Sequence, residues 1–463
     1  MNYDPVIGIE IHVQLKTRTK MFCGCSLSFG DEPNTHTCPI CLGHPGTLPV
    51  TNAEAVHFAL MIAMAFDCEI APRSIFHRKN YFYPDLPKGY QISQYDIPLA
   101  TAGHLGDVRI HRVHMEEDAA KLIHEGGSGR IHGAETSVVD FNRGGTPLVE
   151  IVTEPDLRSP EQAVGFLLLL KNTLQTVGVS DCDMEKGSLR CDANVSVRPA
   201  GATGLGTKTE LKNMNSFKFL GEGMAAEIER QVGLLEAGDP VLQETLHYDP
   251  ARRELHARRS KEEADDYRYF PEPDLVPLEP SREDVERLRA GLPELPGARI
   301  ARFRGDLGLS AHDASDLNAT PAIAAYFEDA VAAGADPKAA SDWVRNQPGA
   351  VEAVPAVRLA ELIALVSAGT ITATIAKQVY ALLEVEPGVA PAELVERDGL
   401  ATVGDSSELD ALVAQVIDAN PALVEQFRGG KDGVINALVG QVMKETRGRA
   451  DARQVQELLR SRL

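Results

Sequence analysis

Acidic and imidazole side chains alternate with apolar residues along the first strand-like segment of the chain. In residues 6–15, Glu10, His12 and Gln14 occupy even positions, whereas every odd position from 7 to 15 is apolar. Alternate residues of a β-strand point to the same face and lie about 7 Å apart. Glu10 and His12 could therefore bind a common metal ion.

Four other strand-like segments present the same kinds of side chain. For any one of them, the alternative is the ordinary wet face of a half-solvated antiparallel sheet. Taken together, the segments contain the groups that hold a divalent cation and a phosphate. In chain order these groups are Glu116, Glu117 and Asp118, then Glu150, then Asp192 and Asn194, and finally Lys208, Glu210 and Lys212.

A glycine-rich loop precedes the last of these segments. Residues 201–209 nearly match a phosphate-binding loop, but one residue too many separates the last glycine from Lys208, and a strand pattern follows instead of a helix. The motif is rejected because the helix N-terminus that cradles phosphate is missing. Lys208 remains a candidate phosphate ligand.

Four of the seven cysteines cluster early in the chain. Cys23, Cys25, Cys38 and Cys41 are spaced C-x-C, then twelve residues, then C-x-x-C. Paired thiolates at the two ends of a short loop predict tetrahedral zinc, whereas the alternatives are incidental thiols or a redox pair. A site closed by four thiolates has no open position for substrate, so the zinc would be structural.

The whole chain is acidic and has the composition of a globular protein. Its 463 residues carry a net charge of −21, which argues against nonspecific nucleic-acid binding but allows a local basic patch. The N-terminus does not resemble a signal peptide, and the apolar runs are too short to span a membrane. We therefore expect a cytoplasmic protein, in which structural disulfides are rare.

The sequence patterns predict an α+β protein with three domains. Residues 1–294 mix strand patterns with helices at 52–66, from Ser159 and at 219–237, which predicts a large mixed or antiparallel sheet domain carrying the zinc loop. Residues 295–402 are alanine-rich and predict an all-α domain. After a linker at 402–407, residues 407–463 predict a small all-α tail domain.

Basic side chains gather at the C-terminus. From residue 428 to the end, eight lysines and arginines outnumber four acids, which gives a net charge of +4. Phosphate contacts dominate RNA affinity, so this surface is a candidate RNA site, although a solvated helical surface explains the charge equally well. The candidate residues are Arg428, Lys431, Lys444, Arg447 and Arg449.

Eight long motifs lie along the chain, from residue 6 to about 277 and again near the C-terminus. They are VIGIEIHVQL, RKNYFYPDLPKGYQISQ, MEEDAAK, DFNRGGTPLVEIVTEPD, GSLRCDANVSVR, GTKTELKNMNSF, DDYRYFPEPDL and LVGQVMKETRGRADARQV. Together they resemble the B subunit of the bacterial aspartyl/glutamyl-tRNA(Asn/Gln) amidotransferase. The resemblance covers essentially the whole chain.

The resemblance implies an ATP-dependent ligase that corrects misacylated tRNA. A B subunit would use ATP and Mg²⁺ to phosphorylate the side-chain carboxyl of Glu-tRNA(Gln), Asp-tRNA(Asn) or both, and ammonia would then displace phosphate. The implied partners, in a heterotrimer, are the amidase or A subunit, which releases ammonia from glutamine, and the small C subunit. The chain lacks the glycine- and serine-rich signature of amidases, so it should not make its own ammonia.

Matching positions imply roles for the polar residues. The family's metal ligands match Glu10, His12, Glu117 and Glu150, with Asp192 close by. A histidine ligand is less typical for Mg²⁺ and would also suit Mn²⁺.

The basic residues of the matching motifs are candidates for contacts with phosphate, carboxylate or the ammonia path. For each of them, a solvated structural role is the alternative. These residues are Lys79, Arg143, Lys208 and Lys212, and the candidate nucleotide contacts are Lys208, Lys212 and Asn194. The resemblance also implies a structural zinc in the cysteine loop and contact between the tail domain and the outer corner of tRNA.

Two other functions remain open from the residues alone. A zinc-bearing RNA-binding scaffold without catalysis would need only the cysteines and the basic tail, and it leaves the acidic residues unexplained. A stand-alone metallohydrolase using Glu10 and His12 would act without ATP or partners. Amide formation by variants with alanine at His12 or Glu150 separates the ligase from the scaffold, and ATP consumption separates it from the hydrolase.

Overall fold

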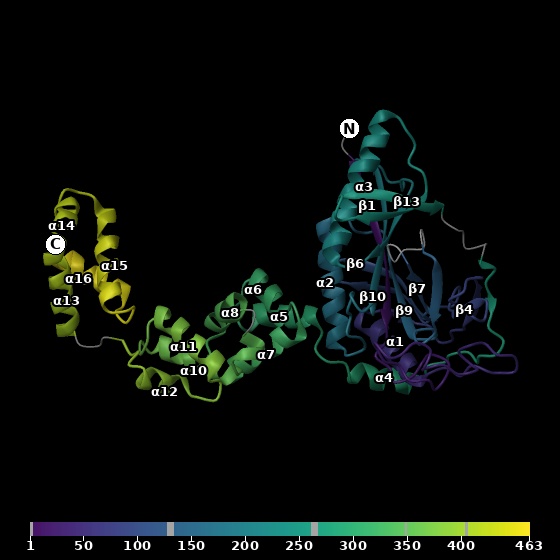
Figure 1. The fold of residues 1–463 in the computed structure, drawn as a ribbon, viewed down its shortest axis with the longest axis horizontal. Helices are drawn as coiled ribbons and strands as arrows, with labels where there is room; N and C mark the ends of the chain where they lie inside the picture. The colour runs from purple at the N-terminus through teal and green to yellow at the C-terminus, as the bar shows by residue number, and fades with distance from the viewer. Residues whose placement is uncertain (1–2, 127–133, 261–266, 348–349, 403–405) are drawn as a thin grey trace. The chain divides into compact units, whose positions relative to one another are not determined.

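The structure is a computed structural model that describes residues 3–126, 134–260, 267–347, 350–402 and 406–463. It divides into two compact units, Met1–Ala298 and Arg299–Leu463, which are described separately (Figure 1). The first unit combines sheets with helices, and the described residues of the second form helices joined by loops. The expected α+β class is therefore confirmed, while the division into three domains stays a prediction.

A nine-stranded sheet forms the centre of the first unit. Its order is β13-β12-β11-β10-β1-β9-β6-β5-β2, and every neighbouring pair is antiparallel except β11 with β12. The long strand β1 therefore lies in the middle of the sheet. The strands are β1 (Tyr3–Gln14), β2 (Glu69–Ile70), β5 (Ala100–Leu105), β6 (Val108–Glu117), β9 (Pro147–Thr153), β10 (Leu189–Pro199), β11 (Thr209–Met214), β12 (Glu244–Asp249) and β13 (Glu254–Ser260).

The two faces of this sheet differ as the alternation in β1 predicts. Ile7, Ile9, Ile11 and Val13 point into the hydrophobic core of the unit and are fully buried. The same core contains buried residues of α1 (Ala53–Ala65), α2 (Pro160–Thr176) and α3 (Phe217–Ala237), which cover this face (Figure 1). The polar residues of β1 lie on the opposite face, which carries the candidate site.

Local signals place the ends of these helices close to the expected residues. The side chain of Asn52 caps α1, and the hydroxyl of Ser159 caps α2, which has Pro160 in its first turn. Gly238 ends α3 with a left-handed backbone (φ 85°), a conformation that glycine adopts without strain. The first unit also contains α4 (Arg282–Ala290).

Two small sheets flank the large one. The first has the order β14-β3-β4, with β3 (His77–Asn80), β4 (Tyr90–Ser93) and β14 (Phe270–Pro271). The second pairs β7 (Lys121–Glu125) with β8 (Thr136–Asp140). The cysteine loop lies between β1 and α1 in the chain.

The second unit packs its helices around two hydrophobic clusters. One cluster includes Phe303, Phe327 and Leu383, and the other includes Val413 and Leu438. The linker expected at 402–407 lies partly outside the described residues. Among the described residues, every helix is too short or too polar to cross a lipid bilayer. The helices are α5 (Pro296–Gly305), which begins within the first unit, then α6 (Ala311–Leu317), α7 (Pro321–Ala332), α8 (Pro337–Asn346), α9 (Ala350–Ala353), α10 (Ala356–Ser367), α11 (Ala373–Val385), α12 (Pro391–Arg397), α13 (Ser406–Ala419), α14 (Pro421–Arg428), η2 (Asp432–Val434), α15 (Ile435–Glu445) and α16 (Ala452–Arg462).

Candidate active site

Three neighbouring strands bring acidic side chains around His12. In the antiparallel register, His12 on β1 lies opposite Glu150 on β9, and Glu150 lies opposite His114 on β6. Glu116 follows His114 by two residues and shares its face. Directly opposed residues of antiparallel strands have neighbouring side chains on one face of the sheet, so these groups converge.

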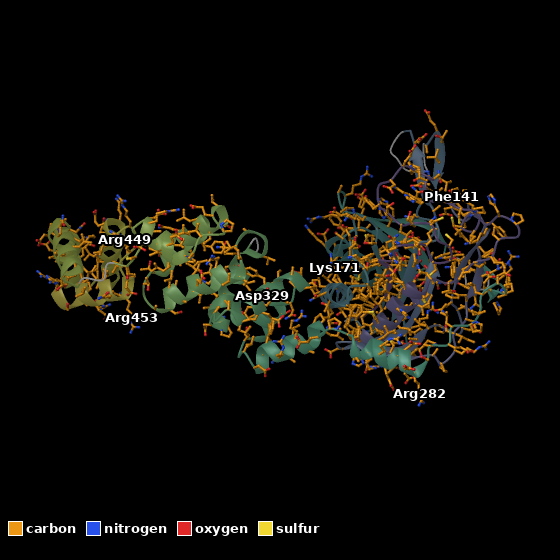
Figure 2. The ribbon with its side chains drawn as sticks, turned by 90° about the horizontal axis from the view of Figure 1, so that it is seen from below. Phe141, Lys171, Arg282, Asp329, Arg449 and Arg453 are labelled. Atoms are coloured by element: carbon orange, nitrogen blue, oxygen red, sulfur yellow. The ribbon has the colours of Figure 1, made fainter. Side chains whose placement is uncertain are left out.

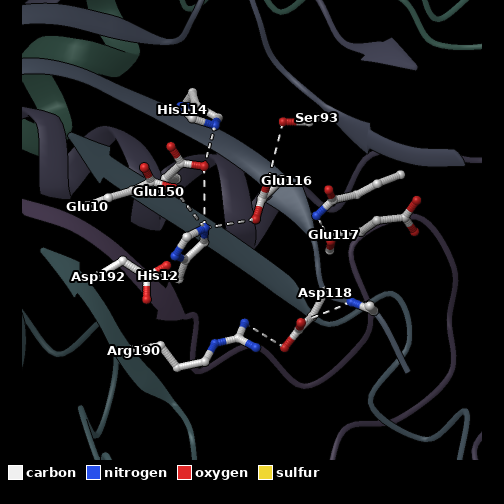
Figure 3. Close-up of polar contacts among 12 residues, drawn as sticks. Glu10, His12, Ser93, His114, Glu116, Glu117, Asp118, Glu150, Arg190 and Asp192 are labelled. Carbon is white, nitrogen blue, oxygen red and sulfur yellow. Dashed lines mark hydrogen bonds and ion pairs between the residues drawn. The ribbon is translucent and has the colours of Figure 1, made fainter. Parts of the chain in front are cut away.

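The imidazole of His12 is at the centre of this group (Figure 3). Its Nε2 atom lies 3.4 Å from Glu150 Oε2, 3.6 Å from Glu116 Oε1 and 3.9 Å from Glu10 Oε1. Asp192 lies opposite Glu10 in the register of β1 and β10. The ligand atoms of His12, Glu116 and Glu150 lie within 4.8 Å of one another, and so do those of Glu10, His12 and Asp192. We call these five residues the carboxylate–histidine cluster.

Opposite charges stabilise the contact between His12 and Glu150. Burial alone would lower the pKa of His12, but Glu150, Glu116 and Glu10 outweigh it and raise the pKa to about 9. Burial would raise the pKa of Glu150, but His114, whose Nε2 atom lies 3.1 Å from Glu150 Oε2, and His12 hold it well below its ordinary value. The protonated imidazole of His12 thus balances part of the carboxylate charge, and it must release this proton before its Nε2 atom can act as a metal ligand.

The chemistry of this donor set fits a divalent cation. Its four carboxylates supply the hard oxygen ligands that Mg²⁺ prefers, and the imidazole also suits Mn²⁺. Burial and the charge of Glu150 raise the pKa of Glu10, although His12 and Lys212 oppose the increase. Crowded acids disfavour one another's charged forms. A cation that binds between the carboxylates removes this repulsion.

Glu117 does not join this cluster. It is the last residue of β6, and its side chain points to the opposite face of the sheet from that of Glu116, because consecutive side chains of a strand alternate between the two faces. Its carboxylate binds Lys88 Nζ at 2.6 and 2.7 Å and accepts the backbone N–H of Ile92 at 2.9 Å. The position next to His12 belongs to Glu116, whereas the matching family positions imply Glu117.

Asp118 occupies a third environment, beyond the end of β6. Its carboxylate lies 3.0 Å from Arg190 Nη2 (Figure 3). It also accepts the side-chain amide of Gln14 at 2.9 Å. Burial would raise the pKa of Asp118, but Arg190 and Arg143 outweigh it and hold the pKa below its ordinary value. The three consecutive acids therefore lie in three different environments.

Two adjoining cavities open over the carboxylate–histidine cluster. One of about 370 Å³ is lined by residues including His12 and Asp192, and one of about 340 Å³ by residues including Glu10 and Glu150. They form one cleft because both are lined by Lys79, Glu116, Lys212 and Tyr267.

The two lysines bring positive charge to the cleft. Lys212 Nζ lies 2.8 Å from Asp192 and 3.4 Å from Glu210. Burial disfavours the charged form of Lys79, but Tyr269, Glu116 and other nearby groups outweigh it and raise its pKa. Both ammonium groups can therefore remain charged where an anionic substrate would enter.

Three other predicted residues lie outside this constellation. Lys208 is exposed just before β11 and lines neither of the two cavities. Arg143 donates to the carbonyl oxygens of Ala119 and Ala120 at 2.9 and 2.8 Å, which fixes the segment after β6. Asn194 lies opposite Glu210 in the sheet and lines neither cavity.

The four predicted cysteines come together. The sulfur atoms of Cys23, Cys25, Cys38 and Cys41 lie within 4.8 Å of one another, and all four are free thiols. A hydrogen bond with Cys23 lowers the pKa of Cys41 to about 4, although burial opposes it. The almost fully buried Lys20 places its Nζ atom 3.7 Å from Cys41 Sγ. Four cysteine sulfurs at these distances could hold a zinc ion.

The C-terminal cations surround the last helices. Arg428, Lys431, Lys444 and Arg447 are exposed. Arg449 is half-buried between α15 and α16 and donates to the carbonyl oxygen of Thr446 at 3.2 Å (Figure 2). Four of the five predicted cations are therefore available at the surface, while Arg449 also supports a turn.

Comparison with known proteins defines the class of this cleft. Residues 5–286 match the model of the GatB/GatE catalytic domain, and residues 325–463 match that of the GatB domain. The carboxylate–histidine cluster lies wholly within the first match.

Relatives that match over their whole length identify the protein family more closely than the two domain matches do. The chain is 50% identical to the aspartyl/glutamyl-tRNA(Asn/Gln) amidotransferase B subunit of Geobacter sulfurreducens, over the whole of both chains. It is 49% identical to the B subunit of Carboxydothermus hydrogenoformans, over 100% of this chain and 99% of the relative, and 50% identical to that of Moorella thermoacetica, over the whole of both. The chain belongs to the family of aspartyl/glutamyl-tRNA(Asn/Gln) amidotransferase B subunits, which confirms the resemblance seen in the sequence.

Proposed function

We propose that this chain activates and amidates the aminoacyl group of misacylated tRNA, converting Glu-tRNA(Gln) to Gln-tRNA(Gln), Asp-tRNA(Asn) to Asn-tRNA(Asn), or both. The observation that carries the proposal is the carboxylate–histidine cluster at the floor of a cleft with two lysines, in a chain of this family. A carboxylate resists ammonia because oxide is a poor leaving group. Phosphorylation replaces oxide by phosphate.

The reaction proceeds in two steps. The side-chain carboxylate oxygen attacks the γ-phosphorus of ATP, the bond to the β-phosphate oxygen breaks, and ADP leaves. Ammonia then attacks the acyl carbon, the carbon–oxygen bond to phosphate breaks, and hydrogen phosphate leaves with the proton that the nitrogen loses, so that the amide remains on the tRNA. Both steps depend mainly on positioning and on neutralisation of phosphoryl charge.

The side chains of the cleft can divide this work. Glu10, His12, Glu116, Glu150 and Asp192 would hold Mg²⁺ or Mn²⁺, which supplies charge neutralisation at the phosphoryl oxygens. Lys79 and Lys212 lie at the shared wall of the two cavities, where their ammonium groups can bind the phosphoryl or carboxylate oxygens of the substrate. Lys208 and Asn194, which line neither cavity, are weaker candidates for nucleotide contact, and Arg143 supports the cleft wall.

The remaining parts fit one component of a larger enzyme. Ammonia would come from a glutaminase partner, the A subunit, with the small C subunit completing a heterotrimer. Cys23, Cys25, Cys38 and Cys41 would hold a structural zinc that stabilises the loop before α1, since the loop contributes few core residues of its own. The exposed cations of the tail would bind tRNA phosphates.

The test uses the purified chain with its glutaminase partner, misacylated Glu-tRNA(Gln), glutamine, ATP and Mg²⁺. Gln-tRNA and ADP are followed together for the wild type, His12→Ala, Glu150→Ala and His111→Ala. His111 is the matched control because it lies on β6 with an exposed side chain paired to Glu154, away from the cluster.

We expect product and ADP to appear in step for the wild type and for His111→Ala. The other two variants should lose both by about 100-fold, since each removes a metal ligand from the cluster. Full activity of both variants would mean that the carboxylate–histidine cluster does not hold the catalytic metal, an outcome that the scaffold alternative also predicts. Product formation without ATP would contradict the ligase chemistry.

A further inference from the structure

Five of the ten tyrosines form one row of ring contacts beside the cleft. The ring centroids of Tyr83 and Tyr81 are 5.9 Å apart, and those of Tyr81 and Tyr267 are 6.2 Å apart. The ring centroids of Tyr267 and Tyr269 are 6.2 Å apart, with 75° between the ring planes. The rings of Tyr269 and Tyr95 stack, with centroids 4.3 Å apart and 9° between the planes. The proposed reaction assigns no role to this row.

The row is built by the small sheet of β3, β4 and β14. Tyr81 follows β3, Tyr95 follows β4, and Tyr267 and Tyr269 precede β14, which pairs with β3. The side-chain amide of Asn80 donates to the carbonyl oxygen of Tyr267 at 3.1 Å, which fixes that segment against β3. The aromatic surface is thus held by regular structure.

Three of these rings face the acidic floor of the cleft. Tyr95, Tyr267 and Tyr269 line the same cavity as Glu116 and Glu150. Tyr81 and Tyr267 line the adjoining cavity with His12, whereas Tyr83 lines neither. The cleft therefore has a polar floor and an aromatic wall, which we call the tyrosine wall and define as Tyr95, Tyr267 and Tyr269.

Ordinary core packing does not explain the tyrosine wall. None of its three residues belongs to the hydrophobic clusters of the described residues, and Tyr95 is 40% exposed. Lys79 places its ammonium 4.8 Å from the centroid of Tyr267, so the wall also lies next to a cation that can bind phosphate. Aromatic rings beside phosphate-binding groups suit stacking with the base of a nucleotide.

We propose that the tyrosine wall stacks an adenine base next to the reacting groups. The proposal rests on the proposed function, in which two substrates carry adenine. One is ATP, and the other is the 3′-terminal adenosine of tRNA, whose ribose bears the aminoacyl ester. Either base would be positioned by stacking, while its phosphates or its ester face the polar floor.

The experiment measures dissociation constants for the full chain with its partner subunits. The probes are Mg²⁺–ATP, uncharged tRNA, and the same tRNA lacking its terminal adenosine. The variants are Tyr95→Ala and Tyr269→Ala, with Tyr95→Phe and Tyr269→Phe to retain the ring, and Tyr95→Leu to retain apolar bulk without a flat ring if an alanine variant does not fold. Tyr83→Ala is the matched control, because Tyr83 belongs to the row but lines neither cavity.

Loss of stacking should weaken binding about 10- to 100-fold for the substrate whose base is held. If ATP is held, its dissociation constant rises in the alanine variants and both tRNAs bind as before. If the terminal adenosine is held, the wild type prefers intact tRNA and the alanine variants lose that preference. The phenylalanine variants and Tyr83→Ala should stay within about threefold of the wild type.

Unchanged ATP binding together with an unchanged preference for intact tRNA in Tyr95→Ala, Tyr269→Ala and Tyr95→Leu would overturn the stacking proposal. Failure of the proposed function is distinguishable, because it shows as a wild type that forms no amide and consumes no ATP with its partner.

Discussion

At the scale of single residues, three consecutive acids after His114 and Met115 have three different partners. Glu116 faces His12, Glu117 binds Lys88, and Asp118 binds Arg190. Strand alternation separates the first two, and the end of β6 releases the third. Neighbours of identical charge can therefore be assigned different chemistry from geometry alone.

This difference predicts that Glu116→Gln and Glu117→Gln have separable effects. Glu116→Gln removes a charged donor from the carboxylate–histidine cluster, so Mn²⁺ affinity should fall at least about tenfold. Glu117→Gln leaves the ammonium of the largely buried Lys88 without its carboxylate, so the free energy of unfolding should fall by about 1–3 kcal/mol. Mn²⁺ titration and urea unfolding of both variants give the two readouts.

Glu154→Gln is the control, because Glu154 pairs with His111 outside the cleft. It should leave Mn²⁺ affinity unchanged and stability within about 0.5 kcal/mol. If instead Glu117→Gln weakens Mn²⁺ binding and Glu116→Gln does not, Glu117 is the ligand, as the matching family positions imply.

At the scale of elements, the sequence predicts what local chemistry determines. Asn52, Ser159 with Pro160, and Gly238 act within one turn of their own helix, so the ends of α1, α2 and α3 could be placed. The alternation in β1 likewise determined which face is polar. Both signals are short-range, and neither requires knowledge of the partner strand.

Strand register is not short-range, and it determines the rest of the site. The opposition of His12 to Glu150, and of Glu150 to His114, joins residues that are far apart in the sequence. A shift of one residue in β6 would exchange Glu116 for Glu117, so sequence alone left that choice open. Glu116 and His114 are two residues apart, so their side chains share a face of the strand, and this was the available signal. It identifies the metal ligand only once the register is known. Lys208 and Arg143 were predicted to lie near the reacting groups because they belong to matching motifs. In the structure, their side chains lie in other surroundings.

The cysteine loop yields a prediction for a whole element. We expect about one zinc per chain, and Cys41→Ser should reduce zinc content and expose residues 22–50 to proteolysis, because a closed thiolate site contributes folding energy directly. Metal analysis and limited proteolysis provide the measurements. Cys182→Ala is the control, because Cys182 is buried in the core away from the loop. Equal zinc content and equal cleavage rates in wild type and Cys41→Ser would contradict a structural metal.

At the scale of the whole molecule, the distribution of charge matters more than its sum. The chain carries −21, yet residues 428–463 carry +4. Salt screens the repulsion between the net charge and RNA beyond the Debye length, so binding depends on contacts where cations are exposed. Lys431 and Lys444 are exposed there, whereas Arg282 is an exposed cation on α4 in the other unit (Figure 2).

The charge distribution therefore predicts how tRNA binding depends on salt. Removing a cation that contacts a phosphate should lower the slope of log Kd against log salt concentration by about 0.7–0.9, because one fewer counterion is released. We expect this change for Lys431→Ala and for Lys444→Ala, with the double variant losing about twice as much, and an unchanged slope for the control Arg282→Ala. Filter binding or fluorescence anisotropy between about 50 and about 200 mM salt measures the slopes. If the tail variants keep the wild-type slope while Arg282→Ala reduces it, tRNA phosphates are held by the sheet unit, and the basic tail is a solvated helical surface.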